Sequence, residues 1–203
     1  MLLKLKTEIT QNDDSTSFFF SDVTPFYNSV SYPNGYDLTG INGFNPDDID
    51  TTRLLLDITL PDSSVVNLVI PDTAFDTANI GTTGLITYEI PYSLLGYSSN
   101  LSDGIYKFTY TIYSLDGTKS FTKSCYITVL YNICCCLEKK LASLPLCSKC
   151  SDKQKKQIDS LWDAYMRKSV VTHLVACHKN TEAQEHIDYL TNYCNIKNCD
   201  SCN

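Results

Sequence analysis

The chain has 203 residues, of which 43% are hydrophobic and 19% are charged, and its formal net charge is −7. This composition is too apolar for a disordered protein and is ordinary for a globular one. Residues 1–131 carry 6 Lys and Arg against 15 Asp and Glu, whereas residues 132–203 carry 10 against 8. The acidic first part lacks the clustered basic residues of a nucleic-acid groove, so direct sequence-specific nucleic-acid binding is not expected.

The first residues give no targeting signal. Met1-Leu2-Leu3 is followed at once by Lys4 and Lys6, which leaves no apolar segment. The most apolar run, 126–137, is shorter than the roughly 20 residues of a membrane helix. We therefore expect synthesis in the cytosol and no membrane partner.

Residues 1–131 repeatedly show the two-residue period of β-strands. The predicted strands lie near residues 3–9, 18–20, 54–60, 66–70, 85–90, 106–112 and 125–131. Asp116-Gly117 predicts the turn of a hairpin between the last two strands, and a segment rich in Asn, Gly, Pro and Asp between Asn28 and Thr52 predicts a long surface loop. About seven strands in roughly 130 residues are typical of an antiparallel β-sandwich.

One short motif refines this fold. Asp103-Gly104-Ile105-Tyr106, at the start of a predicted strand, resembles the tyrosine corner of immunoglobulin-like and fibronectin-III-like domains. The chain has no Cys…Trp…Cys signature of true immunoglobulin domains, so the resemblance concerns the fold and not the function. We expect an α+β protein in which an immunoglobulin-like antiparallel β-sandwich, residues 1–131, precedes a small three-helix, cysteine-rich region, residues 132–203.

After residue 131 the period of apolar residues changes to that of helices. We expect a first helix over about 133–144, which Pro145 ends. The second is predicted to span 152–177 behind the capping box Ser151-Asp152-Lys153-Gln154, and the third is predicted to follow a similar box at Thr181-Glu182-Ala183-Gln184. The apolar stripes of these helices need a partner surface, which is either the sandwich or another subunit.

Nine of the ten cysteines lie in this helical tail. Without a secretory signal, such crowding favours reduced thiols or metal ligands over a disulfide framework. Buried thiols that act as small apolar residues are one alternative, and a structural zinc site is another. The candidate metal ligands are Cys134, Cys135, Cys136, Cys147, Cys150, Cys194, Cys199 and Cys202.

The lengths of the predicted helices indicate which cysteines meet. The second helix is about 39 Å long and the third returns only about 20 Å, so one zinc site shared by the pairs Cys147/Cys150 and Cys199/Cys202 is awkward. If the first helix lies antiparallel to the second, its start and the end of the third reach the same level. We therefore expect residues 134–136 to lie near Cys194, Cys199 and Cys202, with the other pair farther away.

The sequence offers little for catalysis. It contains no phosphate-binding loop, dinucleotide fingerprint, GxSxG or HExxH motif. The adjacent Cys177 and His178 do not face each other on a helix, and the acidic segment 47–50 lacks the spacing of an EF-hand loop. We therefore expect no enzyme, and a thiol- or metal-dependent enzyme is the weakest of the alternatives.

Aromatic residues are the stronger functional signal, because they supply contact area at interfaces with little loss of entropy. Several tyrosines lie in or beside predicted loops, and two aromatic residues belong to the stripe of the second helix. The candidate interface residues are Tyr27, Tyr32, Tyr36, Tyr92, Tyr97, Trp162 and Tyr165. Isolated surface rings beside turns are the alternative explanation for any one of the tyrosines.

The tail sequence Asn132-Ile133-Cys134-Cys135-Cys136-Leu137-Glu138-Lys139, continuing through Cys147-Ser148-Lys149-Cys150 to the segment 193–202, resembles small cysteine-tailed virion proteins of crAss-like bacteriophages. In particular, it resembles the ring proteins that stack beneath the portal in the tail barrel. The resemblance covers about the last third of the chain and the plan of a β domain before it. It implies a homo-oligomeric, twelvefold ring that contacts the portal or neighbouring ring proteins.

The first functional hypothesis is therefore a virion structural protein of the head-tail connector or tail barrel, assembled in the host cytoplasm. An acidic ring would let DNA pass without adhering, because like charges repel. The second hypothesis is a binding module, such as a fibre, decoration or adhesion protein, that uses the loop between Asn28 and Thr52. A ring predicts a high-order oligomer, which distinguishes the two.

Overall fold

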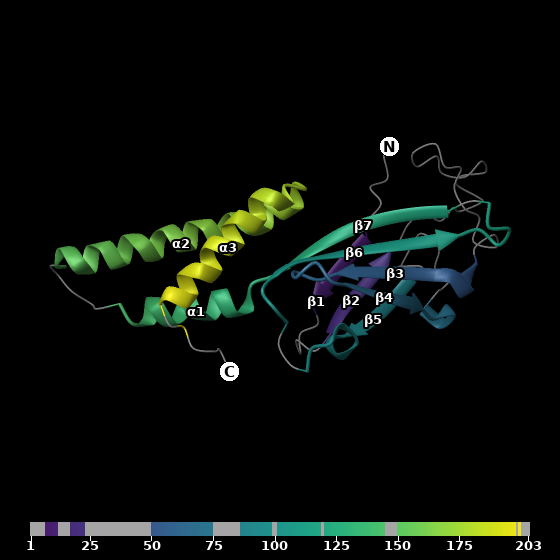
Figure 1. The fold of residues 1–203 in the computed structure, drawn as a ribbon, viewed down its shortest axis with the longest axis horizontal. Coiled ribbons are helices and arrows are strands. Elements are labelled where there is room, and N and C mark those ends of the chain that lie inside the picture. Colours follow the sequence, from purple (N-terminus) through teal and green to yellow (C-terminus); the bar gives the residue numbers. More distant parts are fainter. Residues whose placement is uncertain are drawn as a thin grey trace. The chain divides into compact units, whose positions relative to one another are not determined.

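The structure is a computed structural model, and it describes residues 7–11, 17–22, 50–74, 86–98, 101–118, 120–144, 150–197 and 199. The fold is α+β, with two antiparallel sheets and three helices (Figure 1). Contacts divide the chain into a β unit, residues 1–100 and 107–125, and a helical unit, residues 101–106 and 126–203. The predicted boundary at residue 131 marks the change of period, whereas the contacts assign the adjoining ends of two strands to the helical unit.

The strands form two sheets. The first has the order β1-β2-β5, with β1 at Thr7–Gln11, β2 at Ser17–Asp22 and β5 at Ile86–Pro91. The second has the order β4-β3-β6-β7, with β3 at Leu54–Thr59, β4 at Val65–Ile70, β6 at Gly104–Tyr113 and β7 at Ser120–Val129. Each of the seven predicted strands has a counterpart, and the hairpin turn contains Gly117 with a positive φ of 69°.

The two-residue period places the core on one face of the second sheet. Buried side chains alternate with exposed or half-buried ones along β3 and with half-buried ones along β6. The register aligns Leu56 with Tyr110 and Ile58 with Phe108 across the two strands, so their side chains share one face. The buried residues of these strands are Leu54, Leu56, Ile58, Tyr106, Phe108, Tyr110 and Ile112.

Phe18 joins the two sheets of the β unit. Its side chain on β2 is 0% exposed, and its ring lies edge-on to Phe108 on β6, with 5.3 Å between the ring centroids. A second edge-on contact, at 5.1 Å, joins Phe18 to Tyr92 in the 3₁₀ turn after β5. One aromatic side chain therefore packs against both the opposite sheet and the turn that closes its own sheet.

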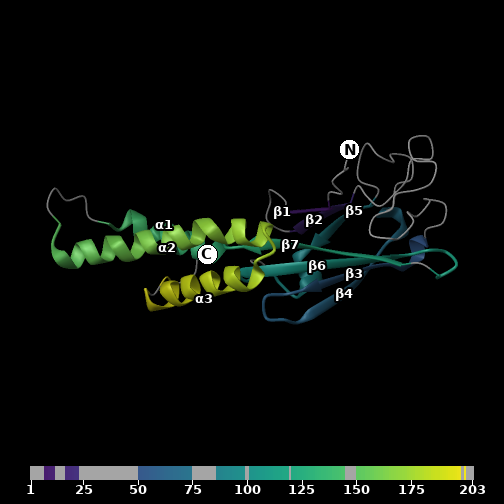
Figure 2. The ribbon, with the colours of Figure 1, turned by 90° about the horizontal axis from the view of Figure 1, so that it is seen from above.

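The helices are α1 at Tyr131–Ala142, α2 at Asp152–Ala176 and α3 at Asn180–Ile196 (Figure 2). The sequence predicted α2 to within one residue, but α1 begins two residues earlier than expected and ends before Ser143. No helix among the described residues is long and apolar enough to cross a membrane.

The ends of α2 explain one correct and one incorrect prediction. Ser151 and Gln154 form the expected capping box, in which the Ser151 hydroxyl accepts from the Gln154 N–H and the Gln154 side chain accepts from the Ser151 N–H. The second box, at residues 181–184, is wrong because α3 already begins at Asn180. A Schellman turn ends α2: His178 has φ 58°, and the Lys179 N–H donates to the Leu174 carbonyl at 2.9 Å. This turn leads directly into α3.

The helical unit has its own hydrophobic core. The buried residues of this core are Ile133, Leu137, Leu161, Ala164, Val171, Val175, Ala183, Ile187, Leu190 and Tyr193. Ile105 of β6, Tyr126 of β7 and Leu130 pack against them and belong to the same unit. The apolar stripes of the three helices are thus covered largely by one another.

We predict that Phe18→Ala lowers the free energy of unfolding of the β unit by about 3–5 kcal/mol, because it leaves a cavity between the sheets. The exposed Leu115, in the turn between β6 and β7, provides the control, and Leu115→Ala should change stability by less than about 0.5 kcal/mol. Urea denaturation followed by circular dichroism measures both. A loss at Phe18 no larger than that at Leu115 would contradict the packing between the sheets.

Candidate functional site

Asp103 caps the first helix of the helical unit, α1. The start of α1 has no side-chain cap of its own, because its N-cap residue is Leu130. The Asp103 carboxylate supplies the missing acceptor: it accepts from the Ile133 N–H at 2.7 Å and from the Asn132 N–H at 3.0 Å. A carboxylate at this end of a helix satisfies unpaired N–H groups and interacts favourably with the helix dipole.

The electrostatics of Asp103 reflect its partial burial. Burial raises the pKa of the carboxyl group above its ordinary value, while hydrogen bonds from the N–H groups of residues 131–133 act in the opposite direction. Burial is the larger effect. Burial is the main cause of the raised pKa of the Cys194 thiol on α3, and the negative charge of Asp103 contributes to it.

The cysteines of α1 meet those at the end of α3. Cys136 and Cys199 form a disulfide, with 5.3 Å between their Cα atoms. The Cys199 N–H donates to the Cys194 carbonyl at 3.2 Å, so Cys194 lies beside this disulfide. The predicted meeting of the α1 cysteines with Cys194 and Cys199 is confirmed at Cys136, while Cys202 lies outside the described residues.

The preference for thiols or metal ligands over disulfides is wrong at four positions. Cys136 and Cys199 are bonded to each other, and Cys135 and Cys150 are also disulfide-bonded. A disulfide sulfur has no thiolate to offer a metal ion. Among the described residues no group of three or more candidate metal ligands occurs, and Cys147 lies outside them.

The disulfide acts on a long loop. It joins positions 63 residues apart and encloses α2, α3 and the second half of α1. In the chain-entropy model, closing a loop of this length stabilises the folded state by about 4 kcal/mol, because it restricts the unfolded chain. The disulfide therefore stabilises the helical unit.

The candidate interface tyrosines differ in their surroundings. Tyr92 is buried against Phe18, so its ring belongs to the core of the β unit and the prediction of an exposed interface side chain is wrong there. Tyr97 is half-buried, and together with Tyr92, Ser17 and Glu89 it lines a cavity of about 350 Å³. Tyr27, Tyr32 and Tyr36 lie outside the described residues.

The two aromatic candidates of α2 also differ. Trp162 is 68% exposed and Met166, one turn later, is 50% exposed. Tyr165 is half-buried and packs against the helical core. On the same helix, Arg167 bonds to Asp163 at 3.0 Å and lies over the ring of Tyr189 on α3, at 4.0 Å from the ring centroid.

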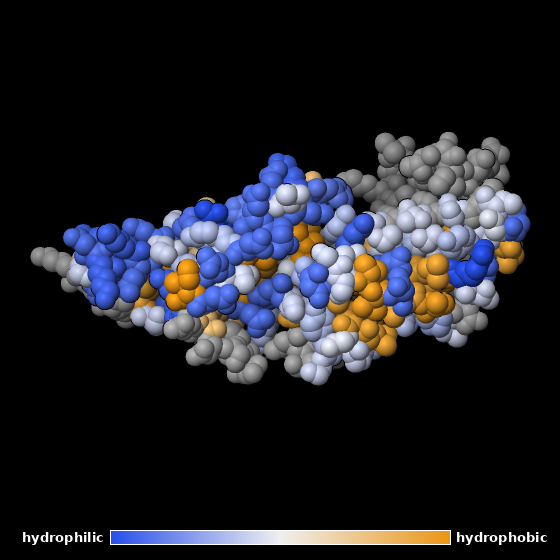
Figure 3. All heavy atoms as spheres, in the orientation of Figure 1, coloured by the Kyte–Doolittle hydropathy of each residue, from blue (hydrophilic) through white to orange (hydrophobic). Residues whose placement is uncertain are grey.

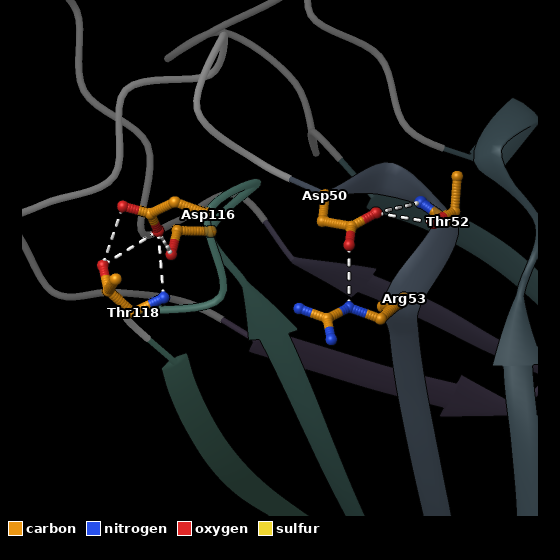
Figure 4. A network of polar contacts seen from close by, with 6 residues as sticks. Asp50, Thr52, Arg53, Asp116 and Thr118 are labelled. Carbon is orange, nitrogen blue, oxygen red and sulfur yellow. Dashed lines mark hydrogen bonds and ion pairs between the residues drawn. The ribbon is translucent and has the colours of Figure 1, made fainter.

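Two aspartates of the β unit, Asp50 and Asp116, hold the backbone of neighbouring turns through hydrogen bonds. Asp50 accepts from the Thr52 hydroxyl at 2.6 Å and pairs with the Arg53 side chain at 2.7 Å (Figure 4). Asp116 accepts in the same way from the N–H and hydroxyl of Thr118, at 2.9 and 2.8 Å. Hydrogen bonding by Thr52 is the largest cause of the lowered pKa of Asp50. These carboxylates hold the local backbone.

One pocket of the helical unit is basic. It measures about 210 Å³ and lies between the C-terminal ends of α1 and α3 and the first half of α2. Lys140 and Lys197 line it together with Tyr193, whose ring lies 5.6 Å from the Lys197 ammonium group. The pocket therefore carries positive charge in a protein whose overall charge is negative.

We predict that Asp103→Ala destabilises the helical unit by about 0.5–2 kcal/mol, because N–H groups at the start of α1 lose their acceptor. Asp159, on the exposed face of α2, is the control, and Asp159→Ala should leave stability within about 0.5 kcal/mol. Thermal unfolding monitored by far-ultraviolet circular dichroism measures the difference. Equal effects of the two substitutions would contradict the capping role.

We predict that peptide mapping without reductant finds Cys136 linked to Cys199, and that alkylation at pH 8 modifies exposed Cys177 well before Cys194. Burial raises the pKa of Cys194 from 9.0 to about 11. At pH 8 its reactive thiolate is therefore about 100-fold scarcer than that of a thiol with a pKa of 9.0, and the thiolate fraction increases only as the pH approaches 11. Labelling in denaturant should remove the difference. Stoichiometric zinc in place of the linked peptides would overturn the assignment.

Comparison of the chain with protein-family models, with curated proteins and with solved structures finds no match. Function is therefore inferred from the contacts, exposure and charge of the residues described above.

Proposed function

We propose that the protein is a structural component of a bacteriophage virion, in the head-tail connector or tail barrel, and that it acts by assembling into a homo-oligomeric ring. Its partners are further copies of itself, the portal and neighbouring ring proteins. The proposal starts from the resemblance of the cysteine-rich tail and is supported by the exposure of apolar side chains on α2. No catalytic role is included.

The observation that carries the self-assembly part of this proposal is the exposure of Trp162. A tryptophan that is 68% exposed, with an exposed methionine one turn away, leaves a large apolar area in water. Tryptophan is the residue type most enriched at the centres of protein interfaces.

We also propose that the two sheets form an immunoglobulin-like sandwich. The sheet orders β1-β2-β5 and β4-β3-β6-β7 correspond to strands A-B-E and C′-C-F-G of such domains, and the Phe18–Phe108 contact brings the sheets face to face. Tyr106 supports the assignment further. It lies near the start of β6, the sixth strand, and its hydroxyl donates to the Ser102 carbonyl at 2.9 Å, as in a tyrosine corner.

The covalent closure of the helical unit suits a structural role. A component of a particle works outside the cell, where disulfides persist. The Cys136–Cys199 bond would then stabilise the unit after release from the host, whereas assembly in the cytoplasm would involve the reduced chain.

We predict that native mass spectrometry of the purified chain shows a high-order oligomer, alone or with the portal. Trp162→Ala should weaken assembly by at least about 2 kcal/mol, or about 30-fold, because it removes the central apolar contact. Asp159→Ala, one turn earlier on the exposed face, should assemble normally. A protein that stays monomeric with and without the portal, or is missing from purified particles, would refute the proposed function.

A further inference from the structure

The edge strand β4 differs from a well-protected sheet edge. It pairs with β3 on one side, and no described residue pairs with its backbone on the other. Its sequence, Val-Val-Asn-Leu-Val-Ile, contains no charged residue and no proline. Natural edge strands usually carry lysine, proline or a bulge, since an unprotected edge offers its free N–H and C=O groups to another strand.

The side chains of β4 extend this unprotected edge into an apolar surface. Val65 is 52% exposed and Val69 is 62% exposed, and Leu55 on β3, the register partner of Val69, is also exposed. Figure 3 shows hydrophobic residues gathered over the region of the β unit in which Figure 1 places β3 and β4. A strand from another chain would cover both the backbone edge and this surface.

The sequence of β4 identifies the partner strand as another copy of itself. The sequence is nearly symmetric about Asn67. An apolar residue lies next to Asn67 on each side, Val66 before it and Leu68 after it, and a valine lies two residues away on each side, at Val65 and Val69. In an antiparallel pair centred on Asn67, Val65 of one copy therefore lies opposite Val69 of the other. The same pairing places Asn67 opposite Asn67, and Val66 opposite Leu68 on the other face.

From these observations we propose that β4 is a self-association edge, at which two copies of the chain pair antiparallel about a two-fold axis through Asn67. The four-stranded sheets of the two copies, each β4-β3-β6-β7, then form one continuous eight-stranded sheet. Asn67 is already held by its hydrogen bond to Asp57 at 2.6 Å, so the centre of the contact is ordered before the copies meet. The contact is isologous, and it is independent of the ring contact proposed for α2.

The contact has the charge properties that pairing requires. Asp57 is the charged residue nearest the axis, and it lies on β3, one strand farther from the axis than Asn67. The two Asp57 carboxylates of a dimer are thus separated by three strand spacings, about 14 Å, and are screened at physiological salt. The residues of β4 at the contact itself are uncharged, so no like charges lie opposite each other there.

Two matched double substitutions test this register. Val65→Lys with Val69→Lys places lysine opposite lysine, whereas Val65→Glu with Val69→Lys places glutamate opposite lysine. Both alter only exposed side chains, so both variants should fold, and thermal unfolding confirms it. All proteins carry Trp162→Ala, so that loss of the strand contact is distinguishable from loss of the ring contact.

Sedimentation equilibrium of the full chain should show a concentration-dependent dimer. The Lys/Lys variant should dissociate at least about tenfold more readily, and the Glu/Lys variant should retain the dimer, because its opposite charges face each other in the two-fold register. A monomeric parent protein, an unaffected Lys/Lys dimer, or equal loss in both variants would overturn the proposal. Equal loss would instead indicate head-to-tail pairing of β4 with a different strand.

Discussion

The helical unit depends on one carboxylate. Asp103 lies in the turn before β6, yet it accepts the hydrogen bonds that begin α1, about 30 residues later. It thereby fixes where the helix starts. The position of Cys136 on α1 follows from that start, and with it the possibility of bonding to Cys199 beyond α3. The covalent bond therefore depends on the start of α1, and the start of α1 depends on the cap by Asp103.

The same turn serves two purposes. Tyr106 donates to the carbonyl of Ser102, the residue just before Asp103, and so holds the backbone from which the carboxylate extends. Burial of Asp103 costs solvation of its charge, and the N–H groups of α1 recover part of that cost. A tyrosine that fixes a turn and an acid that caps a helix therefore act on neighbouring residues, which couples the geometry of β6 to that of α1.

The sequence was sufficient for the strands and for α2, because their signals are local. Alternating apolar residues place β3 and β6, and the box at Ser151 places the start of α2. The predicted helix lengths also led to the prediction that residues 134–136 lie near the end of α3. The cap by Asp103 was missed because its partners lie far away in the chain, where no spacing rule connects them. The aspartate directly before Gly104 at a strand start was the only available signal.

Two further errors have physical causes. Tyr92, between Pro91 and Gly96, has the neighbours of a loop residue, but the 3₁₀ turn directs its ring toward Phe18. Cysteine spacing shows which sulfurs can meet and does not reveal their oxidation state, which depends on the surroundings of the protein. The sequence therefore located Cys136 and Cys199 near each other and assigned them the wrong chemistry.

The disulfide has a consequence for proteolysis. Because Cys136 is joined to Cys199, residues 136–199 form a closed covalent ring that contains α2 and α3. A single peptide bond cut anywhere within this ring opens it without releasing a fragment, and the two pieces separate only after reduction. The helical unit would thus tolerate one cleavage by a protease, because the disulfide keeps the two pieces joined.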